Sequence, residues 1–161
     1  MKLYIKQKVS FWDEFFVKDE NGTDRYRVDG EIFTFGKRLH VYDMARGNEE
    51  IMYLAQKPFA FLPKVDIYDR EDGEVLFTVN REFTLFVPSF YAEGLDWHVQ
   101  GDFGAHNYEI TCGDKLVATV EKEWFTWGDS YAIEIYDVSD ELYCLGILLA
   151  VDIINAAQAS S

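Results

Sequence analysis

The stretch LYCLGILLAV, residues 142–151, contains no charged or amide side chain over nearly three turns of a possible helix. A helix that is apolar on every side cannot lie on a protein surface, because part of it would face water. The rest of the chain has the patterns of β-strands. The stretch therefore predicts a hydrophobic α-helix over residues 140–157 that is surrounded by a closed β-sheet.

The same stretch is too short to be a membrane anchor. A bilayer span needs about 20 apolar residues, and Asp152 and Asn155 interrupt the continuation of this run. Ser139 is the expected N-cap of the helix, because its hydroxyl suits that position. Asp152 follows the apolar run directly and is expected to be a structural acid at the end of the barrel. It should reach solvent or pair with a backbone amide or a basic side chain, because an unpaired buried carboxylate is costly.

Short alternating or aromatic-rich runs between turn signals predict about a dozen strands before the helix. These runs lie at residues 2–8, 12–18, 25–29, 31–36, 38–43, 51–57, 64–69, 74–80, 82–91, 96–103, 106–111, 115–122 and 130–137. The pattern aromatic, any, Val, any, Gly, acid occurs twice, at residues 26–31 and 97–102. We expect a mainly β chain, one domain over residues 1–161. Its closed barrel of about 12 strands has two similar halves, 25–69 and 96–137, and encloses the hydrophobic C-terminal helix.

Charge is distributed unevenly along the chain. Residues 1–69 hold 11 of the 15 Lys and Arg and have a net charge of −1, whereas residues 70–161 contribute −13 to the total of −14. Nucleic-acid binding needs many phosphate contacts on a basic face, so no nucleic-acid partner is expected. The same balance disfavours binding to membrane lipid. Lys37 and Arg38 with His40 form a weak candidate anion site, for which an ordinary solvated hairpin is the better explanation.

Several motifs together resemble a known family. They are Y-x-V-x-G-E (26–31), VYD (41–43), IYD (67–69), WHVQGDF (97–103), YEI (108–110), KEWFTWGDSY (122–131) and LLAVD (148–152). Their order is similar to that of the LURP-one-related family of the tubby C-terminal-like superfamily, over essentially the whole chain. The resemblance implies a 12-stranded barrel around a hydrophobic helix and supplies no catalytic residues. Superfamily relatives bind phosphoinositides or are proposed to act on membrane lipids, but no basic cluster here matches theirs position by position.

Four potential metal or acid–base groups lie within eleven residues: Asp96, His98, Asp102 and His106. The even spacing of the first three places them on one face of a strand, and a turn at Gly104 could return His106 to them. Asp102 occupies the acidic position that Glu31 fills in the first repeat, which indicates a structural role beside the repeated glycine. No G-x-S-x-G, P-loop, H-E-x-x-H or C-x-x-C motif is present in the sequence.

Two further stretches invite functional hypotheses. The acidic residues 66–74 could suggest calcium, but their spacing does not fit a calcium loop and a solvated hairpin is expected. Trp124 aligns with Phe83 in a partial repeat and is expected in the core. Phe125 and Trp127 would face the other side and are candidates for a partner surface.

A helix that fills the barrel leaves no internal pocket, so a ligand must bind at the rim or on hairpin loops. We expect a non-enzymatic scaffold or binding module for an unknown protein or small ligand, without cofactor, metal or catalytic residues. The alternatives are a peripheral phospholipid- or phosphoinositide-binding protein and an enzyme or metal site at residues 96–106. Cys112 and Cys144 are too few for a disulfide framework, and residues 1–9 lack the apolar run of a secretion signal, so a cytoplasmic location is expected.

Overall fold

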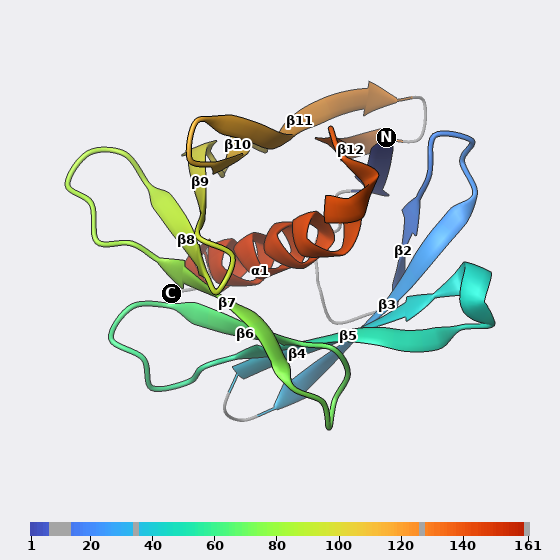
Figure 1. Cartoon of the computed structure of the whole chain (residues 1–161), viewed down its shortest axis with the longest axis horizontal. Helices are drawn as coiled ribbons and strands as arrows, with labels where there is room; N and C mark the ends of the chain where they lie inside the picture. Colours follow the sequence, from blue (N-terminus) through green and yellow to red (C-terminus); the bar gives the residue numbers. More distant parts are fainter. Residues whose placement is uncertain (7–13, 34–35, 126–127, 160–161) are drawn as a thin grey trace.

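Twelve antiparallel strands close into a barrel around one C-terminal helix in the computed structural model, which describes residues 1–6, 14–33, 36–125 and 128–159 (Figure 1). The strands are β1 (Lys2–Lys6), β2 (Phe15–Lys18), β3 (Asp24–Phe33), β4 (Gly36–Asp43), β5 (Glu49–Gln56), β6 (Lys64–Tyr68), β7 (Val75–Arg81), β8 (Ser89–Glu93), β9 (Trp97–Asp102), β10 (Asn107–Cys112), β11 (Lys115–Phe125) and β12 (Gly128–Ile135). Two short 3₁₀ turns, η1 (Met44–Arg46) and η2 (Val138–Asp140), precede β5 and the helix α1 (Glu141–Ala159). Each strand pairs with its neighbours in the chain, and β1 pairs with β12, so that no sheet edge remains open. The predicted fold class is confirmed.

Successive side chains of each strand point alternately into and out of the barrel. In β9, Trp97 and Val99 are buried, whereas His98 and Gln100 are exposed. The matching residues of the first repeat, Tyr26 and Val28, are also buried, so the repeated sequence pattern marks equivalent inward positions.

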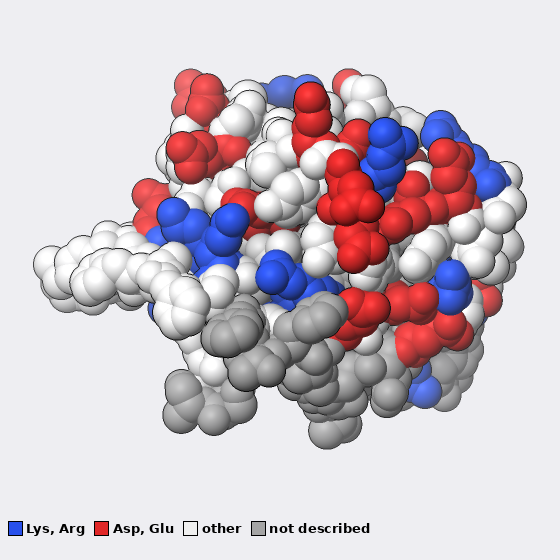
Figure 2. Space-filling view, turned by 90° about the horizontal axis from the view of Figure 1, so that it is seen from below, with Lys and Arg blue, Asp and Glu red and all other residues white. Residues whose placement is uncertain are grey.

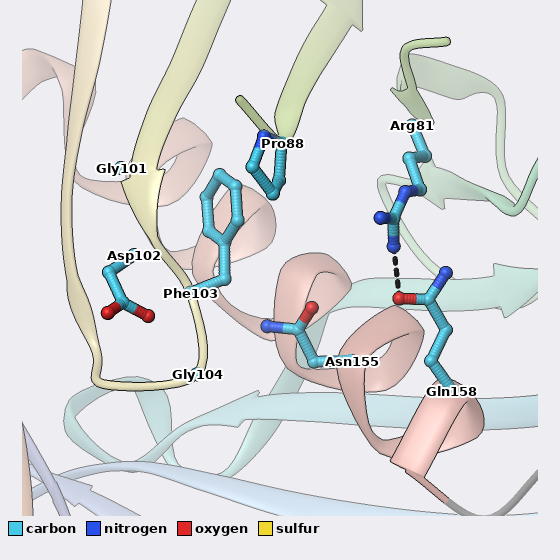
Figure 3. Close-up of a pocket in the computed structure, with 8 residues that line it drawn as sticks. All are labelled: Arg81, Pro88, Gly101, Asp102, Phe103, Gly104, Asn155 and Gln158. Atoms are coloured by element: carbon cyan, nitrogen blue, oxygen red, sulfur yellow. Dashed lines mark hydrogen bonds between the residues drawn. The ribbon is translucent and has the colours of Figure 1, made fainter. Parts of the chain in front are cut away.

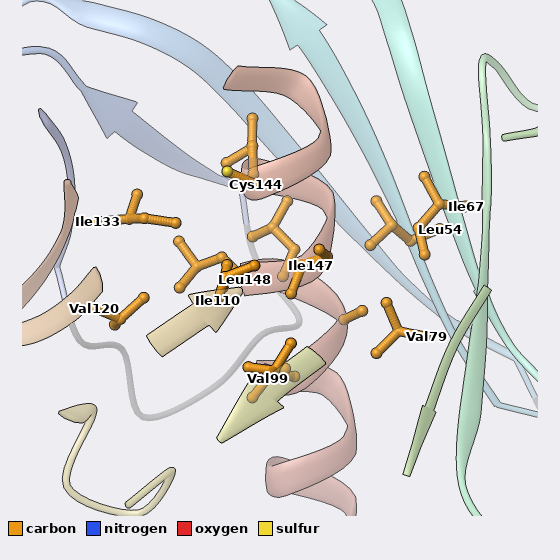
Figure 4. Packing of buried hydrophobic residues seen from close by; sticks show 14 of the residues in the cluster. Leu54, Ile67, Val79, Val99, Ile110, Val120, Ile133, Cys144, Ile147 and Leu148 are labelled. Atoms are coloured by element: carbon orange, nitrogen blue, oxygen red, sulfur yellow. The ribbon is translucent and has the colours of Figure 1, made fainter. Parts of the chain in front are cut away.

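The helix is buried on all sides in its central part. Every residue from Cys144 to Ile154 is buried, and Figure 4 shows Ile147 and Leu148 among inward side chains of the surrounding strands. A Cβ added to Gly146 would lie 3.0 Å from Phe77 Cζ and 3.2 Å from Met52 Sδ, so glycine permits the close approach of α1 to β5 and β7. The buried run begins two residues later than the apolar sequence run, because Leu142 is still exposed at the barrel mouth. Across the described residues, no helix combines the length and apolar character needed to cross a membrane.

The predicted N-cap was wrong. Asp137, not Ser139, caps the chain before the helix: its carboxylate accepts hydrogen bonds from the Ser139 amide at 3.0 Å and the Ser139 hydroxyl at 2.7 Å. These bonds stabilise η2, and α1 begins only at Glu141. The same hydrogen bonds hold the pKa of Asp137 below its usual range. A 3₁₀ turn before the helix moves the cap upstream, which the preference of serine for N-caps could not indicate.

Two strand boundaries also differ from the sequence pattern. The runs at 25–29 and 31–36 are one strand, β3, since Gly30 pairs with Leu39 inside a continuous ladder. The run at 82–91 is a strand only from Ser89, and residues 82–88 form a loop instead.

The alternation of strand direction separates the connections into two ends. One end, called here the loop end, carries the described connections 57–63, 82–88 and 103–106 and the last turns of α1. The other, called the turn end, carries the turns 19–23, 44–48, 69–74, 94–96 and 113–114 and the start of α1. Gly22, Gly47 and Gly113 adopt positive φ angles in these tight turns, which explains the glycine signals of the sequence.

The barrel should not fold without its helix. The large apolar side chains of α1 that are fully buried contribute about 10–20 kcal/mol as an upper estimate, comparable with the roughly 5–15 kcal/mol net stability of a domain. We expect a chain that ends at Ser139 to lose cooperative unfolding in circular dichroism, whereas a chain that ends at Gln158 should unfold like the full chain. A soluble 1–139 chain with a cooperative thermal transition would contradict the prediction.

Candidate functional site

The structure does not bring the predicted metal or catalytic cluster together. Asp96, His98 and Asp102 do face outward, as their even spacing predicts, but each has a different partner. The Tyr91 hydroxyl donates to Asp96, and His98 Nδ1 lies 3.6 Å from Glu82 Oε1. Asp102 accepts a hydrogen bond from the amide of Ala105 at 3.0 Å and so shapes its own loop. Among the described residues, no three His, Cys, Asp or Glu are placed to hold a metal ion.

His106 turns away from the other three residues. It adopts a left-handed conformation with φ of 49°, and its ring stacks on that of Tyr131 with centroids 4.1 Å apart. Its Nε2 lies 3.7 Å from Asp152 Oδ1. The β9–β10 loop therefore directs His106 onto the helix, and not onto the outer face of β9.

Asp152 is held inside the barrel by side chains. It is 3% exposed and accepts a hydrogen bond from the Tyr131 hydroxyl. Burial, followed by the nearby carboxylate of Asp152, raises the pKa of Tyr131 well above its usual value, which keeps this tyrosine a donor. The expected pairing exists, but its partners are a tyrosine and a histidine, and Asp152 does not reach solvent.

Tyr108 lies in the same interior region, but its hydroxyl does not bond to Asp152 as that of Tyr131 does. Its hydroxyl is buried and has no hydrogen-bond partner among the described residues. Burial, and then the charge of Asp152, raise its pKa well above the usual range.

Tyr131, Asp152 and His106 are groups of the kind that transfer protons, but Tyr131 and Asp152 are almost fully buried. We interpret the group as a polar tie between α1, β12 and the β9–β10 loop.

The candidate anion site is not assembled either. Lys37 and Arg38 are adjacent in β4, so their side chains leave opposite faces of the sheet. Burial lowers the pKa of Lys37. His40 is engaged by carboxylates: its Nδ1 lies 2.7 Å from Glu50 Oε1 and its Nε2 lies 3.5 Å from Glu31 Oε2. Burial alone would lower the pKa of His40, but the hydrogen bond and charge of Glu50 with the charge of Glu31 outweigh it and raise the pKa above its usual value.

The acidic stretch 66–74 forms the expected hairpin. Asp66 is covered by its partners, since Lys57 Nζ lies 2.8 Å from one carboxylate oxygen and the Thr78 hydroxyl donates to the other at 2.8 Å. Asp69 accepts from the Glu74 amide at 3.0 Å and closes the turn. These interactions account for both carboxylates without a calcium ion.

The three aromatic candidates for a core or partner role cannot be placed from the described residues. The side chains of Trp124 and Phe125 lie outside the described part of the chain, and Trp127 lies outside it entirely. Phe83, the counterpart of Trp124 in the partial repeat, is exposed.

Two neighbouring hairpin loops at the loop end carry exposed apolar side chains. Phe61 and Phe86 are 96% and 92% exposed, and the others are Phe59, Phe83, Leu85 and Val87. A hydrogen bond of 3.0 Å from the Arg81 amide to the Pro63 carbonyl joins the bases of the loops. Both loops extend to the left in Figure 1, and uncharged atoms project on that side in Figure 2.

A pocket of about 400 Å³ opens beside the second loop. Figure 3 shows Asn155 and Gln158 from the last turns of α1 across from Phe103, Pro88 and Arg81. The Arg81 guanidinium donates to the Gln158 side chain and links β7 to the helix. Gly101, with φ of +144°, allows the close approach of β10, since an added Cβ would lie 2.5 Å from the Asn107 carbonyl oxygen. Phe103 and Pro88 are the apolar side chains of its lining, and four charged or amide side chains complete it.

Sequence reasoning left residues 58–63 between two predicted strands but missed the second loop. Residues 82–88 have the composition of a strand, and their apolar side chains were assigned to pairing. The missed signal is proline: Pro58, Pro63 and Pro88 are the chain's three prolines, and all lie in these two loops. Proline cannot donate to a strand ladder and so argues against strand structure there.

Comparison with known proteins agrees with the barrel and its helix. The LURP-one-related family model matches residues 1–152. The chain belongs to the LURP-one-related family. It is also 30% identical over 155 residues, 96% of this chain and 93% of the relative, to the "Uncharacterized protein YxjI" of Bacillus subtilis (strain 168). No solved structure matches significantly.

Within this LURP-one-related barrel, the two buried tyrosines should respond differently to loss of the hydroxyl. Tyr131→Phe removes a hydrogen bond to a buried carboxylate and should lower the free energy of unfolding by about 1.5–3 kcal/mol. Tyr108→Phe is the matched control and should change it by less than about 0.5 kcal/mol or raise it. Urea unfolding of both variants measures this difference, and equal losses would contradict the assigned roles.

The raised pKa of His40 predicts a pH dependence of stability in this LURP-one-related chain. The folded state favours protonated His40, so its stabilising contribution is present below the unfolded pKa of about 6.5 and is lost as pH rises through the raised folded pKa. His40→Gln should therefore destabilise the protein more at about pH 6 than at about pH 9. Chemical unfolding at the two pH values tests this, and Glu50→Gln should shrink the difference. A pH-independent effect of His40→Gln would refute it.

Proposed function

We propose that this chain is a non-enzymatic binding module that takes its ligand at the loop end, outside the filled barrel. The observation that carries the proposal is the pair of adjacent loops with exposed apolar side chains beside the pocket at Arg81 and Asn155. Large apolar side chains that gather on a surface mark interaction sites, because water solvates them poorly.

The barrel interior does not compete as a ligand site. Leu145, Leu148 and Leu149 of α1 are fully buried against inward side chains of the strands. The described ionisable groups that could do chemistry either stand apart on the surface, as His98 and Asp102 do, or are buried, as Asp152 is. These placements support binding over catalysis.

We place the module in the cytoplasm. Both cysteines are free thiols: Cys112 is exposed, and Cys144 lies inside the barrel. Burial raises the pKa of Cys144 to about 12, which keeps it protonated and unreactive. An exposed free thiol is compatible with a reducing compartment.

A fragment screen by NMR on the isotope-labelled full chain tests the proposed site. Aromatic and aliphatic fragments should shift amide signals in residues 57–63, 82–88 and 101–104. Phe61→Ser with Phe86→Ser should abolish these shifts. The control, Val75→Ser with Val138→Ser, removes two exposed apolar side chains at the turn end, 49% and 64% exposed, and should not. Fragments that bind elsewhere, or that bind the Phe variant unchanged, would refute the site.

A further inference from the structure

The two exposed loops have a common design. The segments 58–63 (PFAFLP) and 83–88 (FTLFVP) contain no charged residue. Lys57 and Lys64 bound the first segment, and Arg81 lies at the base of the second. Prolines within both segments restrict the backbone, which lowers the entropy that is lost when the loops bind.

We propose that the loop end docks onto a lipid bilayer that contains anionic headgroups, with the apolar tips of loops 57–63 and 82–88 inserted and the lysines at the level of the phosphates. This inference rests on the proposed function and names the partner of the same site. Phe59, Phe61 and Phe86, each more than 80% exposed, stand on projecting loops. A fluid lipid surface accommodates projecting side chains without the matched pocket that a folded protein partner would need.

The two ends of the barrel differ in charge, and the end proposed to meet the anionic bilayer is the less acidic one. At the loop end, the described residues 6, 14, 31, 36–38, 57–64, 81–89 and 102–106 contain six Lys or Arg and four acidic residues. The segments at the turn end, 18–24, 43–49, 69–74, 93–96, 113–115 and 136–141, contain four Lys or Arg and fifteen acidic residues. Figure 2 shows Lys and Arg next to the uncharged projection, with acidic atoms also beside them and, mixed with further Lys and Arg, over the rest of that face.

The net charge of −14 does not prevent this docking. A seven-residue strand such as β7 spans about 23 Å along its own direction. Even with the tilt of barrel strands, the acidic turns lie roughly two Debye lengths of about 8 Å beyond the loops at physiological salt. The bilayer would therefore interact mainly with the loop end, which is much less acidic than the turn end. The expectation from overall charge treats the two ends as one, whereas the proposal depends on the loop end alone.

Vesicle flotation with the full chain tests the proposal. The wild type should float with phosphatidylcholine vesicles that contain phosphatidylglycerol, more weakly with phosphatidylcholine alone, and less as salt is raised. Phe61→Ser with Phe86→Ser should weaken binding roughly tenfold or more for each phenylalanine removed. Lys64→Gln should weaken binding to the anionic vesicles by roughly fivefold. Val75→Ser with Val138→Ser, the turn-end control, should bind as the wild type does.

Insertion itself is measured with Phe86→Trp, whose fluorescence should shift to the blue and be quenched by brominated lipid. Thermal unfolding of each variant confirms that an altered loop has not altered the barrel. Wild-type protein that does not float with anionic vesicles, equal binding to the two vesicle types, or unchanged binding of the phenylalanine variant would each overturn the proposal. If fragments still map to the loop end while vesicles do not bind, the membrane inference fails and the proposed site stands. If both fail, the site itself is wrong.

Discussion

Burial of one apolar helix inside a closed sheet is the interaction on which the rest of this structure depends. Twelve short strands could not form a stable barrel around empty space, because their inward side chains would have no partner on one side. The helix supplies that partner from Cys144 to Ile154. In return, the closed sheet removes the helix from water on every side. Each part of the molecule is therefore stable only in the presence of the other.

Because the helix fills the barrel, it also carries the carboxylate of Asp152 into the interior, where an unpaired charge would be costly. The helix is longer than its apolar run, so Asp152 is carried into the interior near the loop end. The Tyr131 hydroxyl and the ring of His106 surround its carboxylate, and His106 reaches it only because its loop adopts a left-handed conformation. The polar contacts thus fix how far the helix extends through the barrel, since a shift along the axis would separate Asp152 from its partners.

The fold was predictable from the sequence for a physical reason. Periodicity records which side chains are buried, and burial determines both the strands and the helix, so Tyr26, Trp97 and the run after Leu142 were informative. The candidate site was not predictable in the same way. Even spacing placed Asp96 and His98 on one face correctly, but partners such as Glu82 come from a loop elsewhere in the chain. Spacing along the chain also cannot show that loop 82–88 leaves the sheet, since its apolar residues have the composition of a strand.

The sequence also states the net charge of the chain without showing where the charged side chains lie in space. The value of −14 belongs to the whole chain, whereas a partner meets only one end of the barrel. Because neighbouring strands run in opposite directions, alternate connections fall at the same end, and a regular alternation of composition along the chain becomes a separation in space. Acidic turns such as 69–74 and apolar loops such as 57–63 follow each other in sequence and lie at opposite ends of the fold. A barrel whose interior is filled can bind a ligand only on its outside, and the most exposed apolar side chains of the described residues lie in two connections at one end.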